Sequence, residues 1–266
     1  SLAARPSPGY QWTAVPSPNE EARLTVSTIA NPEAAHPGWA RVVAAATERG
    51  LIVFGGFHPG EDDGVPPLAN GRTVGTLCLL GNAGAAMWTA FRAAPEAADG
   101  RPDPLERWSE RVLGALAAEL GGQALFPFGG PPYRPFVAWA KRAQPVSESP
   151  IGILIHPDYG LWHAYRGALA FADAIELPPP DRRPRPCDAC PDKPCLSTCP
   201  VAAFAPSGYD VGACTGHLTR PEGGDCLGLG CRARRACPVG RGYIYEPDQA
   251  ELHMRAFLKA RLAAES

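Results

Sequence analysis

The stretch that decides the architecture is CDACPDKPCLSTCP, residues 187–200, which brings four cysteines together in a short Pro-rich run. A second and more open set of four follows it, and a proline comes directly after the last cysteine of each set. The first quartet is Cys187, Cys190, Cys195 and Cys199, followed by Pro200; the second is Cys214, Cys226, Cys231 and Cys237, followed by Pro238. The shared Cys-Pro ending is the most specific feature of this pattern.

Clustered thiolates of this kind are ligands for iron–sulfur clusters or for zinc. The bacterial ferredoxin run is C-x2-C-x2-C-x3-C-P, and its last cysteine ligates the other cluster of the pair. The first quartet keeps the opening C-x2-C and the closing C-x3-C-P, with a middle gap two residues longer, whereas the second has gaps of eleven, four and five. Neither quartet pairs two C-x2-C knuckles, as zinc ribbons usually do. We therefore predict two 4Fe–4S clusters, with zinc as the alternative.

The ferredoxin pattern also predicts which cysteines share a cluster. If the closing cysteine of each quartet crosses over, one cluster has Cys187, Cys190, Cys195 and Cys237, and the other has Cys199, Cys214, Cys226 and Cys231. A proline after each closing cysteine has no N–H to donate and turns the chain out of helix, which favours the crossing. The unusual gaps leave a sequential arrangement open.

The rest of the composition limits the partners and the compartment. The chain has 266 residues, nine cysteines and a net charge of −2, so it offers no basic surface for nucleic acid. No apolar run is long enough to span a bilayer, and SLAARPSPGYQW at the start lacks the features of a secretory signal. We expect a cytoplasmic protein without membrane insertion, in which thiols stay reduced. The ninth cysteine, Cys78, lies in an apolar run and is predicted to be a buried, inert thiol.

The chain divides at PPPDRRPRP, residues 178–186, a stiff extended connector. We place a core at 1–180, the cysteine module at 181–245, and at 246–266 a final helix that packs back on the core. Residues 1–35 are predicted to be an arm with one possible strand at 22–28. In the core, the patterns predict helices at 36–50, 85–94, 104–122 and 136–143, and strands at 51–57 and 72–82. Two β-like runs around Pro157, Asp158 and Gly160 predict a hairpin over 150–172.

Two family resemblances follow from these segments. The cysteine module resembles the C-terminal module of epoxyqueuosine reductases and reductive dehalogenases, and CTGHLT at Cys214 looks like the segment that opens the second quartet in the former. In those families the module adjoins a nitroreductase-like core that holds cobalamin. The resemblance therefore implies an α+β chain, with a nitroreductase-like core followed by a ferredoxin-like double-cluster module.

The second resemblance lies in IGILIHPDYGLWHAYRGALAF, residues 151–171, which is similar to the corresponding stretch of CblC-type cobalamin-processing proteins. IELPPP at 175–180 and GTLCLLGNAGAAMWTAFRAA at 75–94 are similar as well. Those proteins bind cobalamin without its lower base and remove its upper ligand. The resemblance implies cobalamin contacts at the matching positions, which are His156, Tyr159, Gly160, Trp162 and Arg166.

Together these features imply an oxidoreductase that moves electrons from its own clusters to cobalt and removes the upper ligand, for example cyanide. The chain departs from both families, since animal CblC-type proteins lack the cysteine module and epoxyqueuosine reductases are longer. Two alternatives stay open: a cobalamin-dependent reductase of an organic substrate, or a non-catalytic carrier or electron-transfer protein. The expected partners are cobalamin and an external donor of the ferredoxin or flavodoxin type.

Several residues have a plainer reading beside the functional one. His156 could be a turn histidine bonded to backbone, and Trp162 could be ordinary core. Arg166 matches an arginine that helps hold glutathione in CblC-type proteins, but here it could meet a corrin amide or a structural carboxylate. Two further sets are ambiguous in the same way. The aromatic loop Phe126, Phe128, Tyr133 and Phe136 could cap a cavity or fill the core, and Arg232, Arg234 and Arg235 could dock an acidic donor, offset cluster charge or face solvent.

Overall fold

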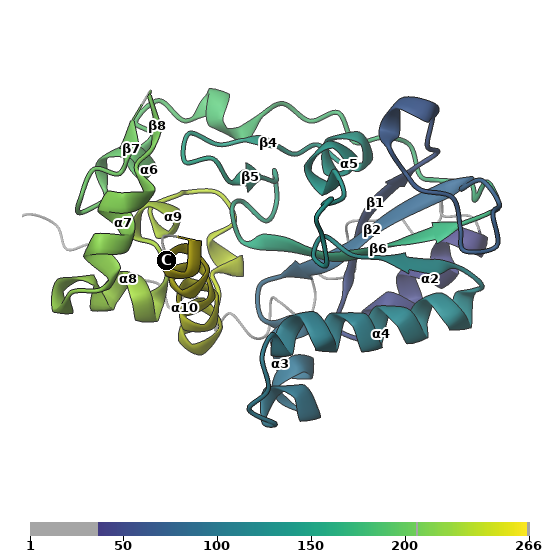
Figure 1. Ribbon diagram of the computed structural model, residues 1–266. Helices are drawn as coiled ribbons and strands as arrows, with labels where there is room; N and C mark the ends of the chain where they lie inside the picture. Colours follow the sequence, from purple (N-terminus) through teal and green to yellow (C-terminus); the bar gives the residue numbers. More distant parts are fainter. Residues whose placement is uncertain (1–36, 206, 265–266) are drawn as a thin grey trace, which may run out of the picture.

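The computed structural model describes residues 37–205 and 207–264, and Figure 1 shows a sheet-containing core beside a group of short helices. The predicted N-terminal arm and its possible strand at 22–28 lie outside the described residues. The described chain is a mixed α+β structure with small antiparallel sheets.

The core is built on a four-stranded antiparallel sheet. Its strands are β1 (Ile52–Phe57), β2 (Thr76–Ala83), β6 (His163–Phe171) and β3 (Gln123–Leu125), in the order β1-β2-β6-β3. The strands predicted at 51–57 and 72–82 are confirmed as β1 and β2. The edge strand β3 was not predicted, because its three residues open a stretch rich in proline and glycine.

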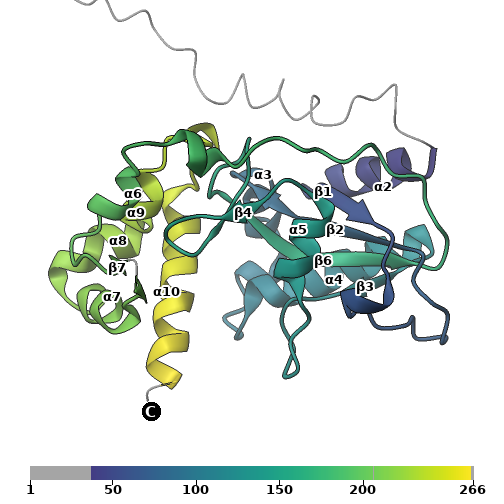
Figure 2. The ribbon, with the colours of Figure 1, turned by 90° about the horizontal axis from the view of Figure 1, so that it is seen from above.

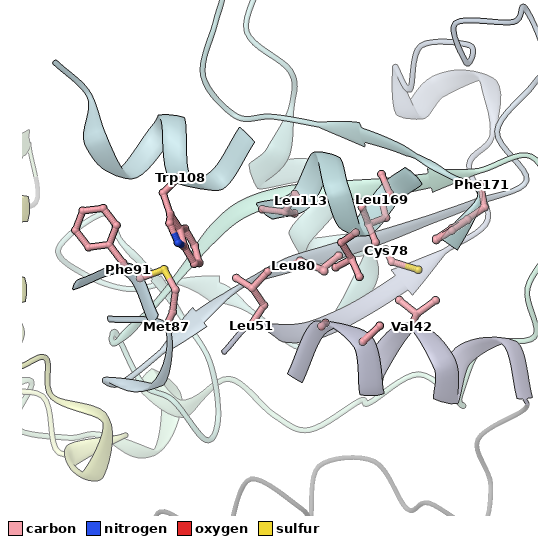
Figure 3. Packing of buried hydrophobic residues seen from close by; sticks show 14 of the residues in the cluster. Val42, Leu51, Cys78, Leu80, Met87, Phe91, Trp108, Leu113, Leu169 and Phe171 are labelled. Atoms are coloured by element: carbon pink, nitrogen blue, oxygen red, sulfur yellow. The ribbon is translucent and has the colours of Figure 1, made fainter. Parts of the chain in front are cut away.

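Helices cover both faces of this sheet. On one face lie α2 (Pro37–Thr47), α3 (Ala86–Arg92) and α4 (Pro104–Leu120), and on the other lies α5 (Phe136–Ala143). Side chains in a strand alternate between faces, so β2 sends Cys78 and Leu80 to the first layer and Leu77 and Leu79 to the second. Figure 3 shows the first layer, with Cys78 among large apolar side chains.

The helix predictions in the core are confirmed, and their ends have local causes. Pro104 starts α4, where its missing N–H costs nothing, and Gly121 ends the helix in the left-handed conformation. Cys78 is fully buried, and burial raises the pKa of its thiol to about 12. The prediction of a buried, inert ninth cysteine is therefore confirmed.

The hairpin predicted over 150–172 is wrong. The first run forms only the short strand β5 (Leu154–Ile155), which pairs with β4 (Ser147–Glu148), while β6 pairs with β2 and β3. Across the turn there is a single bridge between His156 and Gly160. Gly152 in the left-handed region bends the first run, and the apolar side chains of β6 fill both core layers, so both edges of β6 go to longer-range partners.

The cysteine module is made of short elements. No helix or strand occurs from 172 to 185, as expected for the connector. The module contains α6 (Pro194–Ser197), β7 (Phe204–Ala205), β8 (Gly208–Tyr209), α7 (Val211–Leu218), α8 (Gly224–Leu229) and α9 (Arg232–Arg235). Five short 3-10 turns complete the described residues between the longer elements, and these are Glu61–Asp63, Pro95–Ala97, Pro186–Ala189, Pro221–Gly223 and Arg241–Tyr243.

The final helix α10 (Pro247–Ala264) lies within the segment predicted at 246–266. Its first turns contact the core, since the Trp88 indole donates to Asp248 (3.0 Å) and Leu252 packs against the α2–α4 layer. The body of α10 packs against α8, with further contacts to α7, and Figures 1 and 2 show it between the module and the core. In the described part of the chain, no helix combines the length and apolar character needed to cross a membrane.

Candidate metal centre

The eight clustered cysteines fall into two spatial groups. Four of them, from both quartets, line one small cavity, and these are Cys187, Cys190, Cys195 and Cys237. The remaining four influence one another electrostatically, and these are Cys199, Cys214, Cys226 and Cys231. This is the grouping that the ferredoxin crossover predicts, because each closing cysteine lies with the opposite quartet. Ligation of metal stays a prediction.

Local structure explains how each group converges. Cys187 lies in the 3-10 turn Pro186–Ala189, and Cys195 lies in the first turn of α6, which Pro194 starts. Cys214 is on α7, Cys226 is on α8, and Cys231 caps the N-terminus of α9. The helices are short because prolines and glycines interrupt them, so the backbone can turn around a compact group of sulfurs.

Burial and mutual repulsion act on the thiols in the same direction. The pKa of Cys187 is raised first by desolvation and then by the neighbouring Cys237, Cys195 and Cys190. Burial likewise raises the pKa of Cys214 and Cys231. Such groups are hard to ionise without a cation, so metal binding must displace protons from them.

Hydrogen bonds to sulfur are arranged around the second group. The Ala203 N–H donates to Cys199 Sγ (3.4 Å), and the Tyr209 hydroxyl bonds to the Cys214 thiol. Tyr209 stacks on Phe204, with ring centroids 4.8 Å apart. Hydrogen bonds to cluster sulfurs are one determinant of reduction potential, so Tyr209 is suited to tune a cluster at this position.

Each group supplies four thiols, the number of protein ligands that a structural zinc ion or a four-iron cluster takes. Among residues 37–205 and 207–264, no three His, Cys, Asp or Glu side chains converge as they would around one metal ion. A zinc ion with Zn–S bonds of about 2.3 Å holds its sulfurs about 4 Å apart. A four-iron cluster spreads four cysteines over four iron atoms, so its cage is wider. Two groups of four thiols provide the donor set that two such clusters require.

The core forms one wall of the first cysteine cavity. Ser149, Pro150, Ile155 and Leu161 line it together with the four thiols. Ile155 and Leu161 flank the turn at 156–160, within the segment that resembles CblC-type proteins. The first group therefore lies directly against that segment.

Two glycines allow the module to approach this turn. A Cβ on Gly160 would lie 2.0 Å from the Val239 carbonyl oxygen, and a Cβ on Gly240 would lie 2.3 Å from the Tyr159 backbone. Both residues also have positive φ, which favours glycine. The turn and the chain just after Cys237 are thus in backbone contact.

Arg234 fixes the same junction from the module side. Its Nε and Nη2 donate to the Leu161 carbonyl at 3.0 and 2.6 Å. Its guanidinium lies over the rings of Trp162 and Tyr245, 4.4 and 4.7 Å from their centroids. Because Arg234 stands between Cys231 and Cys237, it ties a ligand loop shared by both groups to the start of β6.

The basic run around Arg234 is not a free docking surface. Arg232 and Arg235 both pair with Asp225, the former at 2.5 Å, and Arg234 is engaged at the junction. Structural pairing within the chain was not among the readings considered for this run, and it describes the contacts of all three arginines.

The expected cobalamin contacts divide between two places. His156, Tyr159 and Gly160 form the turn, where His156 Nδ1 accepts the N–H of Asp158 (3.0 Å) and of Tyr159. The plainer reading of His156, a buried turn histidine, is thus supported; burial lowers its pKa to about 4, so it is neutral near pH 7. An ion pair from Arg183 of the connector to Asp158 (2.6 Å) ties down the same turn.

Trp162 and Arg166 lie in a different place, near α10 and the residues just before it. Trp162 is buried against Tyr245, with ring centroids 5.3 Å apart. Among the described residues, no carboxylate lies within ion-pair distance of Arg166, so the structural-carboxylate reading of this arginine is not supported. Its Nε donates to the Tyr165 carbonyl (3.2 Å).

The aromatic loop is split in the same way. Phe136 belongs to the buried layer under α5, while Phe126 and Phe128 stack on each other and are half-buried. Tyr133 is 69% exposed. Only part of this loop is therefore ordinary core.

Sequence reasoning missed Tyr245 and His163, and it singled out Arg234 without predicting its contacts. The cation–π contact between Arg234 and Tyr245 depends on a fold that joins distant segments. His163 was read as part of a strand, yet it is buried beside Phe54 and Tyr165 and its Nδ1 donates to Gly160. The sequence signal that could have identified His163 is its position as a polar residue at the start of an apolar strand. No protein-family model matches this chain, and no curated protein is similar to it.

Proposed function

We propose that this chain is an iron–sulfur oxidoreductase that binds cobalamin base-off and passes electrons from two 4Fe–4S clusters to cobalt, with loss of the upper ligand. The core would be nitroreductase-like and the module ferredoxin-like. The observation that carries the proposal is the shared wall of the first cysteine cavity, in which Ile155 and Leu161 of the CblC-like segment lie beside four thiols.

The chain's own residues would divide the work as follows. The first group, Cys187, Cys190, Cys195 and Cys237, would hold the cluster nearest the core, and the second group would hold the other. The clusters would supply one electron at a time. For a cyanide complex, one electron reduces cobalt(III) to cobalt(II) while the Co–C bond breaks and its electron pair leaves on cyanide, which then takes a proton from water. Arg234 and the Gly160–Gly240 contact would keep the module seated on the core during this transfer.

Removal of the lower base favours the reduction. A nitrogen donor on cobalt stabilises the higher oxidation state, so its displacement makes cobalt easier to reduce. The protein would therefore help by holding the displaced nucleotide tail away from the metal.

The test combines metal analysis with a visible spectrum. Anaerobically purified protein should contain about eight iron and eight sulfide per chain, since each cluster has four of each. Added cob(II)alamin should shift to its base-off spectrum. Stoichiometric zinc without sulfide would overturn the cluster assignment, and an unchanged base-on spectrum at saturating protein would overturn the cobalamin assignment.

The same preparation separates the alternatives. A carrier would bind cyanocobalamin without changing its upper ligand after the clusters are reduced. A reductase of an organic substrate would reduce bound cobalamin but would also turn over a second substrate. A donor of the ferredoxin or flavodoxin type would be expected to re-reduce the clusters.

A further inference from the structure

Arg166 forms no ion pair with any carboxylate of residues 37–205 and 207–264. It is surrounded deeply enough that desolvation lowers its pKa, yet its side chain is only half-buried and keeps accessible surface. Glu106 is the acidic residue that acts on it most, and it lies beyond ion-pair distance among the described residues. An unpaired, desolvated arginine is costly unless an anion completes the site.

Helix α10 carries unsatisfied polar groups on one face, and one of them, His253, is close enough to Arg166 to feel its charge. Gln249 is 0% exposed, and neither its amide oxygen nor its amide nitrogen has a hydrogen-bond partner. His253, one turn further on the same face, has an unpartnered Nε2, and its pKa is lowered to about 3 by burial and by the charges of Arg166 and Arg234. Trp162 Nε1, beside Tyr245, is also buried without a partner.

These groups share one junction. Tyr245 contacts both Trp162 and His253, with ring centroids 5.3 and 5.4 Å apart, and it also acts electrostatically on Arg166. Each buried polar group left unpaired has a desolvation cost, so several at one place call for a bound partner. The side chains offer one positive charge and several N–H donors, which is the set that an anionic oxygen ligand requires.

We propose that Arg166, Gln249 and His253 form an anion-binding subsite that takes the phosphodiester of the nucleotide tail of bound cobalamin. This inference rests on the cobalamin-binding function proposed above. The corrin side chains of cobalamin are neutral amides, and the phosphodiester is its one negatively charged group at neutral pH. The subsite would hold the displaced tail at the junction with α10, away from cobalt.

The experiment compares cobalamin with cobinamide, which keeps the corrin but lacks the phosphodiester and the base. Binding is measured with iron-loaded protein. Arg166→Gln should weaken cobalamin binding roughly 10- to 100-fold, the range for loss of a charge-assisted hydrogen bond, and leave cobinamide binding unchanged. Arg166→Lys should restore part of the loss. Arg49→Gln, which removes an arginine paired with Glu119 elsewhere in the core, is the control and should change neither ligand.

A second variant tests the proposed subsite without changing Arg166. Gln249→Leu should raise the melting temperature of the ligand-free protein, because it removes an unsatisfied buried amide, and should still weaken cobalamin relative to cobinamide. Inorganic phosphate should compete with cobalamin and not with cobinamide. Equal loss of both ligands in Arg166→Gln would assign the arginine to the corrin, and loss of neither would refute the subsite. Absence of binding of either corrinoid to the native protein would instead refute the proposed function itself.

Discussion

Two regions of this chain bury their side chains in different ways. The core packs large apolar residues on both faces of a four-stranded sheet, and Phe91, Leu80 and Trp139 are almost completely buried. The cysteine module has helices of four to eight residues. Its buried apolar residues are mostly small or are cysteines, with one leucine and, at its end, one tyrosine, and they are Cys195, Ala203, Leu218, Cys226, Ala233, Cys237 and Tyr245.

This difference indicates what stabilises each region. A core of large side chains gains enough from the hydrophobic effect to fold without help. A segment as short as the module, with few large buried side chains, usually needs metals or disulfides. Because the module's sulfurs occupy the positions where a core would be, we expect metal binding to supply its folding energy, while the core stays folded without metal.

Metal removal should therefore have the largest effect on stability, and it should unfold the cysteine module while the core stays folded. After cluster loss, amide hydrogen exchange should become fast across residues 187–243 and stay slow in α4, β2 and β6. Cys237→Ser should do the same in part, since it removes a ligand from the first group. Equal loss of protection in both regions, or in neither, would show that the module and core do not differ in this way.

A substitution that creates a cavity in the core should destabilise the core and leave the metal content of the module unchanged. Leu80→Ala removes a fully buried side chain and should lower the free energy of unfolding by about 2–5 kcal/mol in urea titrations. Iron content should not change. Leu229→Ala, at a position 44% exposed, is the control and should shift stability by less than about 0.5 kcal/mol. Loss of iron in Leu80→Ala would mean that the core's packing is needed for metal binding.

The junction between the regions should give a smaller effect. Arg234→Gln keeps a hydrogen-bond donor but loses the charge between Trp162 and Tyr245, so the loaded protein should lose about 1–3 kcal/mol. Exchange should increase around Leu161 while iron content is kept. Arg232→Gln, whose ion pair with Asp225 is exposed to solvent and therefore screened, should cost clearly less than Arg234→Gln. Equal effects of the two variants would remove the special role of Arg234.

The last prediction is a pH dependence of the free energy of unfolding, which should be nearly absent around pH 7. Burial lowers the pKa of His163 to about 3 and of His156 to about 4, below the unfolded value of about 6.5. The unfolded chain therefore binds more protons as pH falls from about 6.5 towards 4, and stability falls in that window. His163→Phe should reduce this slope by about 1 kcal/mol per pH unit on average between pH 5 and pH 7, measured by urea titration, because the unfolded histidine is only partly protonated over that range. An unchanged slope would show that His163 is not held neutral.

Sequence patterns predicted the core well because its elements are set by local rules. Proline and glycine mark the ends of α4, and alternation of apolar residues marks β2 as a buried strand. The hairpin was mispredicted because strand partners depend on distant segments. A turn at Pro157 was visible, but the pairing of β6 with β2 and β3 was not.

In the candidate site, too, local patterns were predicted and contacts between distant segments were not. Cysteine spacing and the two Cys-Pro steps predicted how the thiols group, since the ferredoxin rule describes the crossing directly. The surroundings of Arg234 and Arg166 could not be predicted, because Tyr245 and His253 come near them only after α10 has packed between module and core. His156 was expected at the ligand and was found bonded to its own turn.

One measurement tests the central claim most directly. The protein is reduced anaerobically, freed of excess reductant and mixed with cyanocobalamin while the visible spectrum is followed. Two clusters that each give one electron should convert up to two equivalents of cyanocobalamin per chain to cob(II)alamin and release cyanide. The visible absorption of the clusters, which is weakened by reduction, should return as they are reoxidised. Reduced clusters that stay reduced beside unchanged cyanocobalamin would contradict the account.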